Sequence, residues 1–169
     1  MRERGAFLLM VCFFLIGCAT TKTDSFSRFY GWDQPPVPVE ELVKENAPTA
    51  DQPVRIEELA RTANASYHIV QIRDREQPHT HQAHEAVARL EAGEGIFVLG
   101  RQVLSLKAGD IVVIPQGKPH FFVNTGKEPA VAWVMFIPPF DGKDYVPLLP
   151  QSAQQDPEKQ FVLEEAKKY

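Results

Sequence analysis

Short stretches rich in β-branched and aromatic residues recur between residues 65 and 138, and segments that favour turns separate them. This pattern predicts strands at residues 65–73, 95–100, 102–107, 110–115, 120–125 and 130–138. The separating segments, such as KAGD, PQGKP and NTGKEP, are rich in Gly, Pro, Asn and Asp. Strands this short at this spacing indicate an all-β sandwich or barrel and not a parallel sheet with crossover helices.

The segments that flank these strands have other patterns. PVEELVKEN, residues 38–46, is compatible with a short helix. Residues 156–169 predict a C-terminal helix, because Asp156 suits an N-cap and Pro157 suits the first turn. Residues 136–150 are too rich in proline for a central strand, so we expect an edge strand or a lid there. The exposed loop residues of that segment are expected to be Asp141, Asp144 and Tyr145.

The first residues of the chain predict export. Arg2 and Arg4 precede an apolar run over residues 6–16, which is about half of the length that spans a membrane. Residues 15–18, LIGC, resemble the lipobox of bacterial lipoproteins, which implies removal of the signal peptide at residues 1–17 and acylation of Cys18. Ala19 stands where an aspartate would favour the inner membrane, so the resemblance implies an outer-membrane anchor facing the periplasm. The alternatives are an ordinary cleaved signal peptide and a short uncut anchor.

Residues 18–53 would then form a tether between the lipidated cysteine and the domain. Their polar start and five prolines suit that role. The aromatic residues do not suit a solvated tether, so we expect this part to dock on the domain or on a partner; they are Phe26, Phe29, Tyr30 and Trp32. The main domain is predicted at residues 54–150 and the helical tail at residues 151–169.

The charge balance excludes some classes of partner. The chain has a formal net charge of −4, and removal of residues 1–17 would make it −5. Such a chain offers nothing to nucleic acid or to an anionic lipid surface. The expected contact with the membrane is the lipid anchor at Cys18. Cys18 would be the only cysteine of the mature chain, which leaves no disulfide within it.

The segment GDIVVIPQGKPHFFVN, residues 109–124, carries the strongest local pattern. It matches the second motif of the cupins, GxxxxxPxGxxHxxxN, at all its specified positions, namely Gly109, Pro115, Gly117, His120 and Asn124. Residues 54–140 therefore resemble a cupin, which implies a double-stranded β-helix, or jelly-roll barrel, that encloses a ligand cavity.

The segment PHTHQAHE, residues 78–85, stands where the first cupin motif belongs. The match places His79, His81 and Glu85 at that motif's ligand positions. Histidines two residues apart on a strand project from the same face, and His120 would approach from a facing strand. The resemblance thus implies three histidines and one carboxylate around a divalent metal ion, which suits Mn, Fe, Zn or Ni.

The first motif departs from its pattern. Arg73 replaces the usual glycine, and seven residues instead of six separate Glu85 from Gly93. Counted back from Gly93, the ligand position falls on Ala86, which cannot bind a metal. We therefore expect a β-bulge near His84 and Glu85, with Glu85 as the fourth ligand and His84 as its substitute.

Other candidates have simpler explanations. His68 shares a strand face with apolar residues and is expected to be a packed, hydrogen-bonded core histidine. Three arginines near the first motif suit either an anionic ligand at the cavity mouth or solvated strand ends; they are Arg73, Arg75 and Arg89.

Two functions stay open, because cupins include both enzymes and binding proteins. The first is a metal-dependent cupin that binds a small carboxylate, hydroxy-acid or enolisable ligand, as a dioxygenase or an isomerase would. The second is a non-enzymatic module that captures a ligand or a metal or docks on an envelope complex. The resemblance is also compatible with a homodimer.

Overall fold

The computed structural model describes residues 28–29 and 35–169. The expected signal peptide, Cys18 and the aromatic side chains of residues 26–32 lie outside what it describes. Within the described ranges, no helix has the length and the hydropathy that crossing a bilayer requires. Export and lipid anchoring therefore stay predictions.

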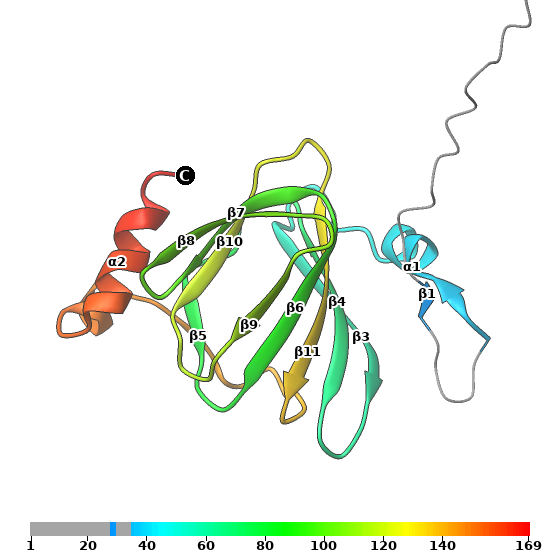
Figure 1. The fold of residues 1–169 in the computed structure, drawn as a ribbon, viewed down its shortest axis with the longest axis horizontal. Coiled ribbons are helices and arrows are strands. Elements are labelled where there is room, and N and C mark those ends of the chain that lie inside the picture. Colours follow the sequence, from blue (N-terminus) through cyan, green and yellow to red (C-terminus); the bar gives the residue numbers. More distant parts are fainter. Residues whose placement is uncertain (1–27, 30–34) are drawn as a thin grey trace, which may run out of the picture.

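Two five-stranded antiparallel sheets form the body of the protein (Figure 1). The first sheet has the strand order β12 (Tyr145–Pro147), β5 (His79–His81), β10 (His120–Asn124), β7 (Glu94–Leu99), β8 (Gln102–Lys107). The second sheet has the order β3 (Val54–Arg61), β4 (Ser66–Ile72), β11 (Ala130–Ile137), β6 (Glu85–Ala92), β9 (Ile111–Ile114). Successive strands such as β5 and β6, or β10 and β11, lie in different sheets, as in a jelly roll. The predicted all-β fold is confirmed.

Apolar side chains from the two sheets meet in the interior. Alternate residues of each strand point inward, as the pleat requires. The largest buried cluster comprises Val70, Ile72, Ala86, Leu90, Phe97, Ile114, Phe122, Ala130, Ala132, Val134 and Phe136. Three of these inward positions carry only alanine, so this core has room for a cavity.

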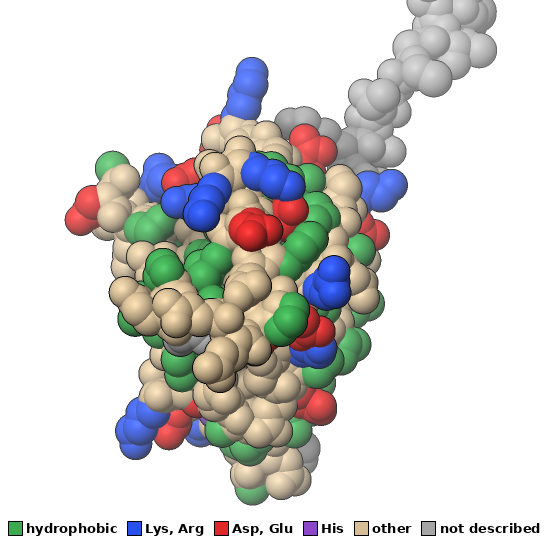
Figure 2. Space-filling model, turned by 90° about the vertical axis from the view of Figure 1, so that its left-hand side faces the viewer, with side chains coloured by type: hydrophobic (Ala, Val, Ile, Leu, Met, Phe, Trp, Pro, Cys, Tyr) green, Lys and Arg blue, Asp and Glu red, His purple; other side chains and the backbone are tan. Residues whose placement is uncertain are grey.

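Short helices cover the outer faces of both sheets. The helix α1 (Val39–Glu45) follows the short pair β1 (Arg28–Phe29) and β2 (Val37–Pro38), and its Val39 packs with Ile69 and Val131 on the second sheet. Part of the expected tether is therefore packed against the body. The 3₁₀ turn η1 (Pro150–Ala153) leads to α2 (Pro157–Ala166), whose buried Val162 packs on the first sheet. Figure 2 shows basic and acidic side chains interspersed over the face that carries α2.

The six predicted strands are present, with small shifts of their ends, and both helices lie where the sequence predicts them. Asp156 caps α2 as expected, because its side chain accepts the backbone N–H groups of Glu158 and Lys159. The sequence does not predict β3, and of β6 it predicts only the part near His84 and Glu85, where a bulge is expected. In β6, EAVARLEA consists of good helix formers, and pairing with β11 and β9 overrides that local preference. β12 is an edge strand, as expected for the proline-rich segment.

Candidate metal centre

Three buried histidines come together on the inner side of the first sheet. His79 and His81 lie on β5, and His120, at the start of β10, pairs directly with His79. The potential ligand nitrogens of the three lie within 4.8 Å of one another. We call these residues the histidine triad. The resemblance to the two cupin motifs predicts this assembly, and the structure places His120 on the strand next to β5 in the same sheet.

A tight turn places His120 opposite β5. The N–H group of Lys118 donates to the carbonyl of Pro115 (3.1 Å), and Gly117 has a φ of 73°. A turn with a positive φ at its third residue strongly favours glycine there. The N–H group of Gly117 also donates to the carbonyl of His81 (2.7 Å), which ties the turn to β5. The motif glycine thus supports the triad from outside.

Backbone carbonyls set the orientation of two imidazole rings. The Nδ1–H group of His79 donates to the carbonyl of Gln77 (2.7 Å), and that of His120 donates to the carbonyl of Lys118 (2.8 Å). In each ring the Nε2 atom then carries the free lone pair. Such outer hydrogen bonds are typical of histidines that bind metals.

The surroundings keep the triad neutral. Burial and, to a smaller extent, the neighbouring histidines lower the pKa of His79 to about 2 and that of His120 to about 4. Burial also lowers the pKa of His81, against the opposing effect of Asp144. Neutral imidazoles offer lone pairs to a metal ion at neutral pH, so the donor set fits a divalent transition metal.

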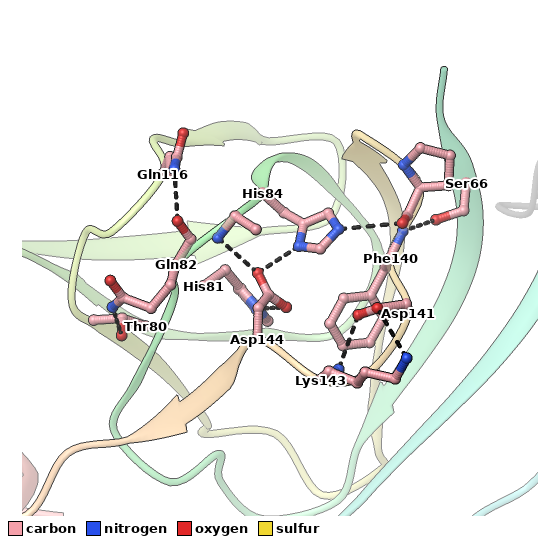
Figure 3. A network of polar contacts seen from close by, with 12 residues as sticks. Ser66, Thr80, His81, Gln82, His84, Gln116, Phe140, Asp141, Lys143 and Asp144 are labelled. Carbon is pink, nitrogen blue, oxygen red and sulfur yellow. Dashed lines mark hydrogen bonds and ion pairs between the residues drawn. The ribbon is translucent and has the colours of Figure 1, made fainter. Parts of the chain in front are cut away.

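A second cluster adjoins the triad around Asp144 (Figure 3). One Asp144 oxygen accepts hydrogen bonds from His84 Nδ1 and from the N–H group of Ala83, and the other lies 3.6 Å from His81 Nδ1. His84 Nε2 lies 3.1 Å from the carbonyl of Pro139. Burial opposes ionisation of Asp144, but its hydrogen bonds from His84 and Ala83 hold its pKa below the usual value. The expectation of an exposed loop residue is wrong for Asp144, whose side chain is 9% exposed.

The structure does not bring Glu85 or His84 into the triad. His84 belongs to the Asp144 cluster, and Glu85 is exposed at the start of β6. The reason is the alternation along β6, in which Ala86 and Ala88 face the interior and Glu85 therefore faces outward. Counting back from Gly93 puts the ligand position of the motif at Ala86, and it is indeed Ala86 that faces the interior.

The bulge lies elsewhere than expected. β6 pairs regularly with β11 from Glu85 to Leu90, and the register shifts between Ala132 and Val131, opposite Leu90 and Ala92. Glu91 is thus the extra residue. The expected bulge near His84 is not found in β6, and the regular pairing there leaves no means to turn Glu85 inward.

A cavity of about 400 Å³ opens between the sheets, and all three triad histidines line it. Tyr145 of β12 lines it too, with its ring stacked on His79 at a centroid distance of 4.4 Å. Glu76 also borders it and accepts the N–H group of Phe122 (2.9 Å), and burial of its carboxyl raises the pKa of Glu76 to about 7. Sequence reasoning missed Glu76, which has no motif position and reaches the cavity only through the fold.

The remaining candidates are held by protein contacts. His68 is buried, with Nε2 2.8 Å from the hydroxyl of Ser66, as expected for a core histidine. Arg73 donates to the carbonyl of Pro48, and Arg89 pairs with Glu91. Of the three arginines, Arg75 alone lines the cavity, and it also donates to the carbonyl of Ala166 in α2 (3.0 Å).

Comparisons with known proteins agree with this fold and site. The family described as "Cupin domain" matches residues 67–137. An uncharacterized protein of Aquifex aeolicus is 37% identical over 108 residues, which are 64% of this chain and 88% of that protein. An acireductone dioxygenase of Geobacillus thermodenitrificans is 37% identical over 70 residues, but these are only 38% of this chain and 38% of the enzyme.

A solved structure supports the same architecture. The crystal structure of an uncharacterized conserved protein with a double-stranded β-helix domain, from Klebsiella pneumoniae, superposes with a TM-score of 0.52. The superposition covers 62% of this chain and 93% of that protein at 21% sequence identity. At this identity the likeness concerns the fold.

Proposed function

The chain belongs to the cupin superfamily, and we propose that it binds a divalent metal ion at the histidine triad and a small organic ligand beside it. The observation that carries this proposal is the set of three buried imidazoles that lie together and line one cavity. The metals that suit these ligands are Mn, Fe, Zn and Ni. A carboxylate, a hydroxy acid or an enolisable compound is the ligand class that such an ion would hold.

His79, His81 and His120 would hold the ion. When bound, it supplies a Lewis acid and a template for the ligand. With these three protein ligands the ion would keep open positions for water or an organic ligand, since Ala86 supplies no fourth donor in the cavity.

Other residues of the chain would support the ligand. The Asp144 carboxylate can hold the proton on His81 Nδ1 and so direct the lone pair of Nε2 toward the site. Glu76 titrates near neutral pH at the edge of the cavity, so it can accept or donate a proton there. Tyr145 covers His79, which shields that ring from water.

The partial match to acireductone dioxygenases and the presence of Glu76 support an enzyme, for which dioxygenation or isomerisation are the reaction classes. A non-enzymatic capture module is the second candidate. The alanine at the inward position of β6 favours it, because the site lacks the carboxylate ligand of the complete motif. Turnover of an enolisable or hydroxy-acid ligand by the metal-loaded chain supports the enzyme, and binding without conversion supports the module.

Elemental analysis of the full-length chain, purified without a His tag, tests the metal. We expect a stoichiometric amount of Mn, Fe, Zn or Ni at neutral pH. Metal far below one ion per chain, after incubation with each ion, would contradict the proposal.

We further propose that Cys18 is lipidated and anchors the chain in the outer membrane, facing the periplasm. The motif LIGC at residues 15–18 supports this proposal. The variant Cys18→Ser should leave the membrane fraction, and acyl chains should be found on the N-terminal peptide of the wild type only. An unmodified Cys18 in the wild type would contradict the anchor. A homodimer is compatible with the family, and size measurement in solution would decide it.

A further inference from the structure

The lining of the cavity differs between its two walls. Its polar side chains come mainly from the first sheet and the segment before it, and include the triad, Glu76, Gln77 and Tyr145. By contrast, every lining side chain that the five strands of the second sheet contribute is apolar. The remaining polar neighbours, Arg75 and Asp110, lie outside the strands and are exposed or partly exposed.

Small residues on two neighbouring strands create the apolar space. Ala86 and Ala88 of β6 and Ala130 and Ala132 of β11 all line the cavity. In the pairing of β6 with β11, Ala86 lies opposite Phe136, Ala88 opposite Val134, and Ala132 opposite Leu90. Each of these alanines therefore lies across from a larger apolar side chain and leaves space beside it. Interiors of small barrels are usually filled by side chains, and these positions leave part of the interior open instead. We call this part the alanine chamber.

The alanine chamber suits hydrocarbon better than water. An apolar cavity of about 150 Å³ in another protein stays dry and binds benzene. The present cavity, at about 400 Å³, exceeds that volume, and its second-sheet wall offers no polar side chain to a water molecule. A compact acid bound at the triad would leave these walls uncovered, and a second charged group in the chamber would lose its hydration without a partner.

We propose that the ligand of this site is amphipathic. Its carboxylate or hydroxy-acid head would lie at the histidine triad, and its aliphatic or aromatic body would fill the alanine chamber. The placement of the polar head at the triad rests on the proposed function, and the placement of the apolar part in the alanine chamber goes beyond it. This assignment distinguishes the site from one built for small diacids or for polar sugars, whose hydroxyl groups would find no partners along the second sheet.

A series of 2-hydroxy acids of increasing length tests whether the apolar part of the ligand fills the alanine chamber. The full-length chain, loaded with Mn²⁺, is titrated calorimetrically with lactate and with its homologues up to 2-hydroxyhexanoate. Each methylene that enters an apolar site lowers Kd about fourfold, so the three added methylenes should lower it about sixtyfold. A Kd that is independent of the length of the acid, or that rises with it, would overturn the amphipathic ligand. If lactate still binds only when the metal is present, the proposed function stands in spite of that result.

A variant that fills the chamber provides the control. Ala132→Leu should abolish the gain in affinity with chain length, whereas Ala60→Val, outside the cavity, should show the same gain as the wild type. Ala88→Val replaces the first variant if that one does not fold. If Kd still falls about sixtyfold along the acid series in a folded Ala132→Leu or Ala88→Val variant, the apolar part of the ligand does not lie in the alanine chamber.

Binding of benzene to the metal-free chain separates the two proposals. Saturable binding that Ala132→Leu removes supports the alanine chamber even if lactate fails to bind and the head-group assignment falls. No benzene binding together with no gain along the acid series would overturn the chamber as a ligand site.

Discussion

The histidine triad and the Asp144 cluster lie side by side, yet their histidines have different partners. His79 and His120 each use one ring nitrogen on a backbone carbonyl and keep the other toward the cavity. His84 has an acceptor at both ring nitrogens, Asp144 and the carbonyl of Pro139. Proximity alone would nominate both groups for a metal, since each brings its potential ligand atoms within 4.8 Å. The hydrogen-bond partners of the ring nitrogens therefore decide which histidine is available to a metal ion.

Removal of a triad histidine should have the largest effect. His120→Ala and His79→Ala each delete one of three ligands, so we expect the metal content at neutral pH to fall to background. His84→Ala, measured under conditions in which the variant is folded, should keep its metal. Elemental analysis of the three purified variants checks this, and the reverse pattern would exchange the roles of the two clusters.

The Asp144 cluster should instead carry stability. His84→Ala removes the hydrogen bond that His84 Nδ1 donates to the buried Asp144 carboxylate, which should cost about 1–3 kcal/mol in the free energy of unfolding. Urea unfolding measures this loss. In the double variant His84→Ala, Asp144→Ala the loss should be smaller than the sum of the two single losses, and strict additivity would show that the pair is not coupled.

Glu76 should make the stability of the metal-free chain depend on pH. Its pKa is about 7 in the folded state and near 4.5 in the unfolded state, so the folded state binds the extra proton between these values. The stabilisation from this group is complete below pH 4.5 and is lost as the pH rises to 7, by about 3 kcal/mol in total. Glu76→Gln should remove this contribution in unfolding curves between pH 4.5 and 8. An unchanged pH profile in the variant would show that Glu76 is ordinarily solvated.

Asp144→Asn should have a moderate effect on the triad. Loss of the charge beside His81 Nδ1 removes the outer partner of one ligand, and such losses typically cost about 10–100-fold in metal affinity. Competition with a chelator measures the affinity. If the variant binds the metal as tightly as the wild type, Asp144 contributes only to the stability of its own cluster and not to the metal site.

Glu85→Ala should have the smallest effect. This side chain is exposed and faces away from the cavity, so the change in unfolding free energy should stay within about 0.5 kcal/mol and the metal content should not change. Loss of metal in this variant would show that β6 turns Glu85 inward when an ion binds.

Local signals account for the parts of the site that the sequence predicts. HxH on one strand needs only alternation, and the turn around Gly117 needs only a backbone conformation that glycine allows. The resemblance to the two cupin motifs then implies that His120 joins the two histidines. The position of Asp144 does not, because it pairs with His84 sixty residues earlier through the meeting of β12 with β5. No local pattern distinguishes Asp144 from the exposed Asp141.

The irregular first motif shows the limit of counting residues. An extra residue before Gly93 indicates a bulge somewhere in the strand, but only the pairing with β11 places it at Glu91. Most residues of β6 favour a helix, so its composition does not indicate a strand. The facing of Glu85 therefore could not be settled without knowing where the register shifts.

X-ray absorption spectroscopy of the metal-loaded full-length chain tests the central claim most directly, because it counts the imidazole rings around the ion. Three histidine ligands are predicted, at about 2.0–2.1 Å if the ion is zinc, with any further ligands being oxygens of water or of the organic ligand. A shell with one imidazole or none, or one unchanged in His120→Ala, would contradict the metal centre proposed here.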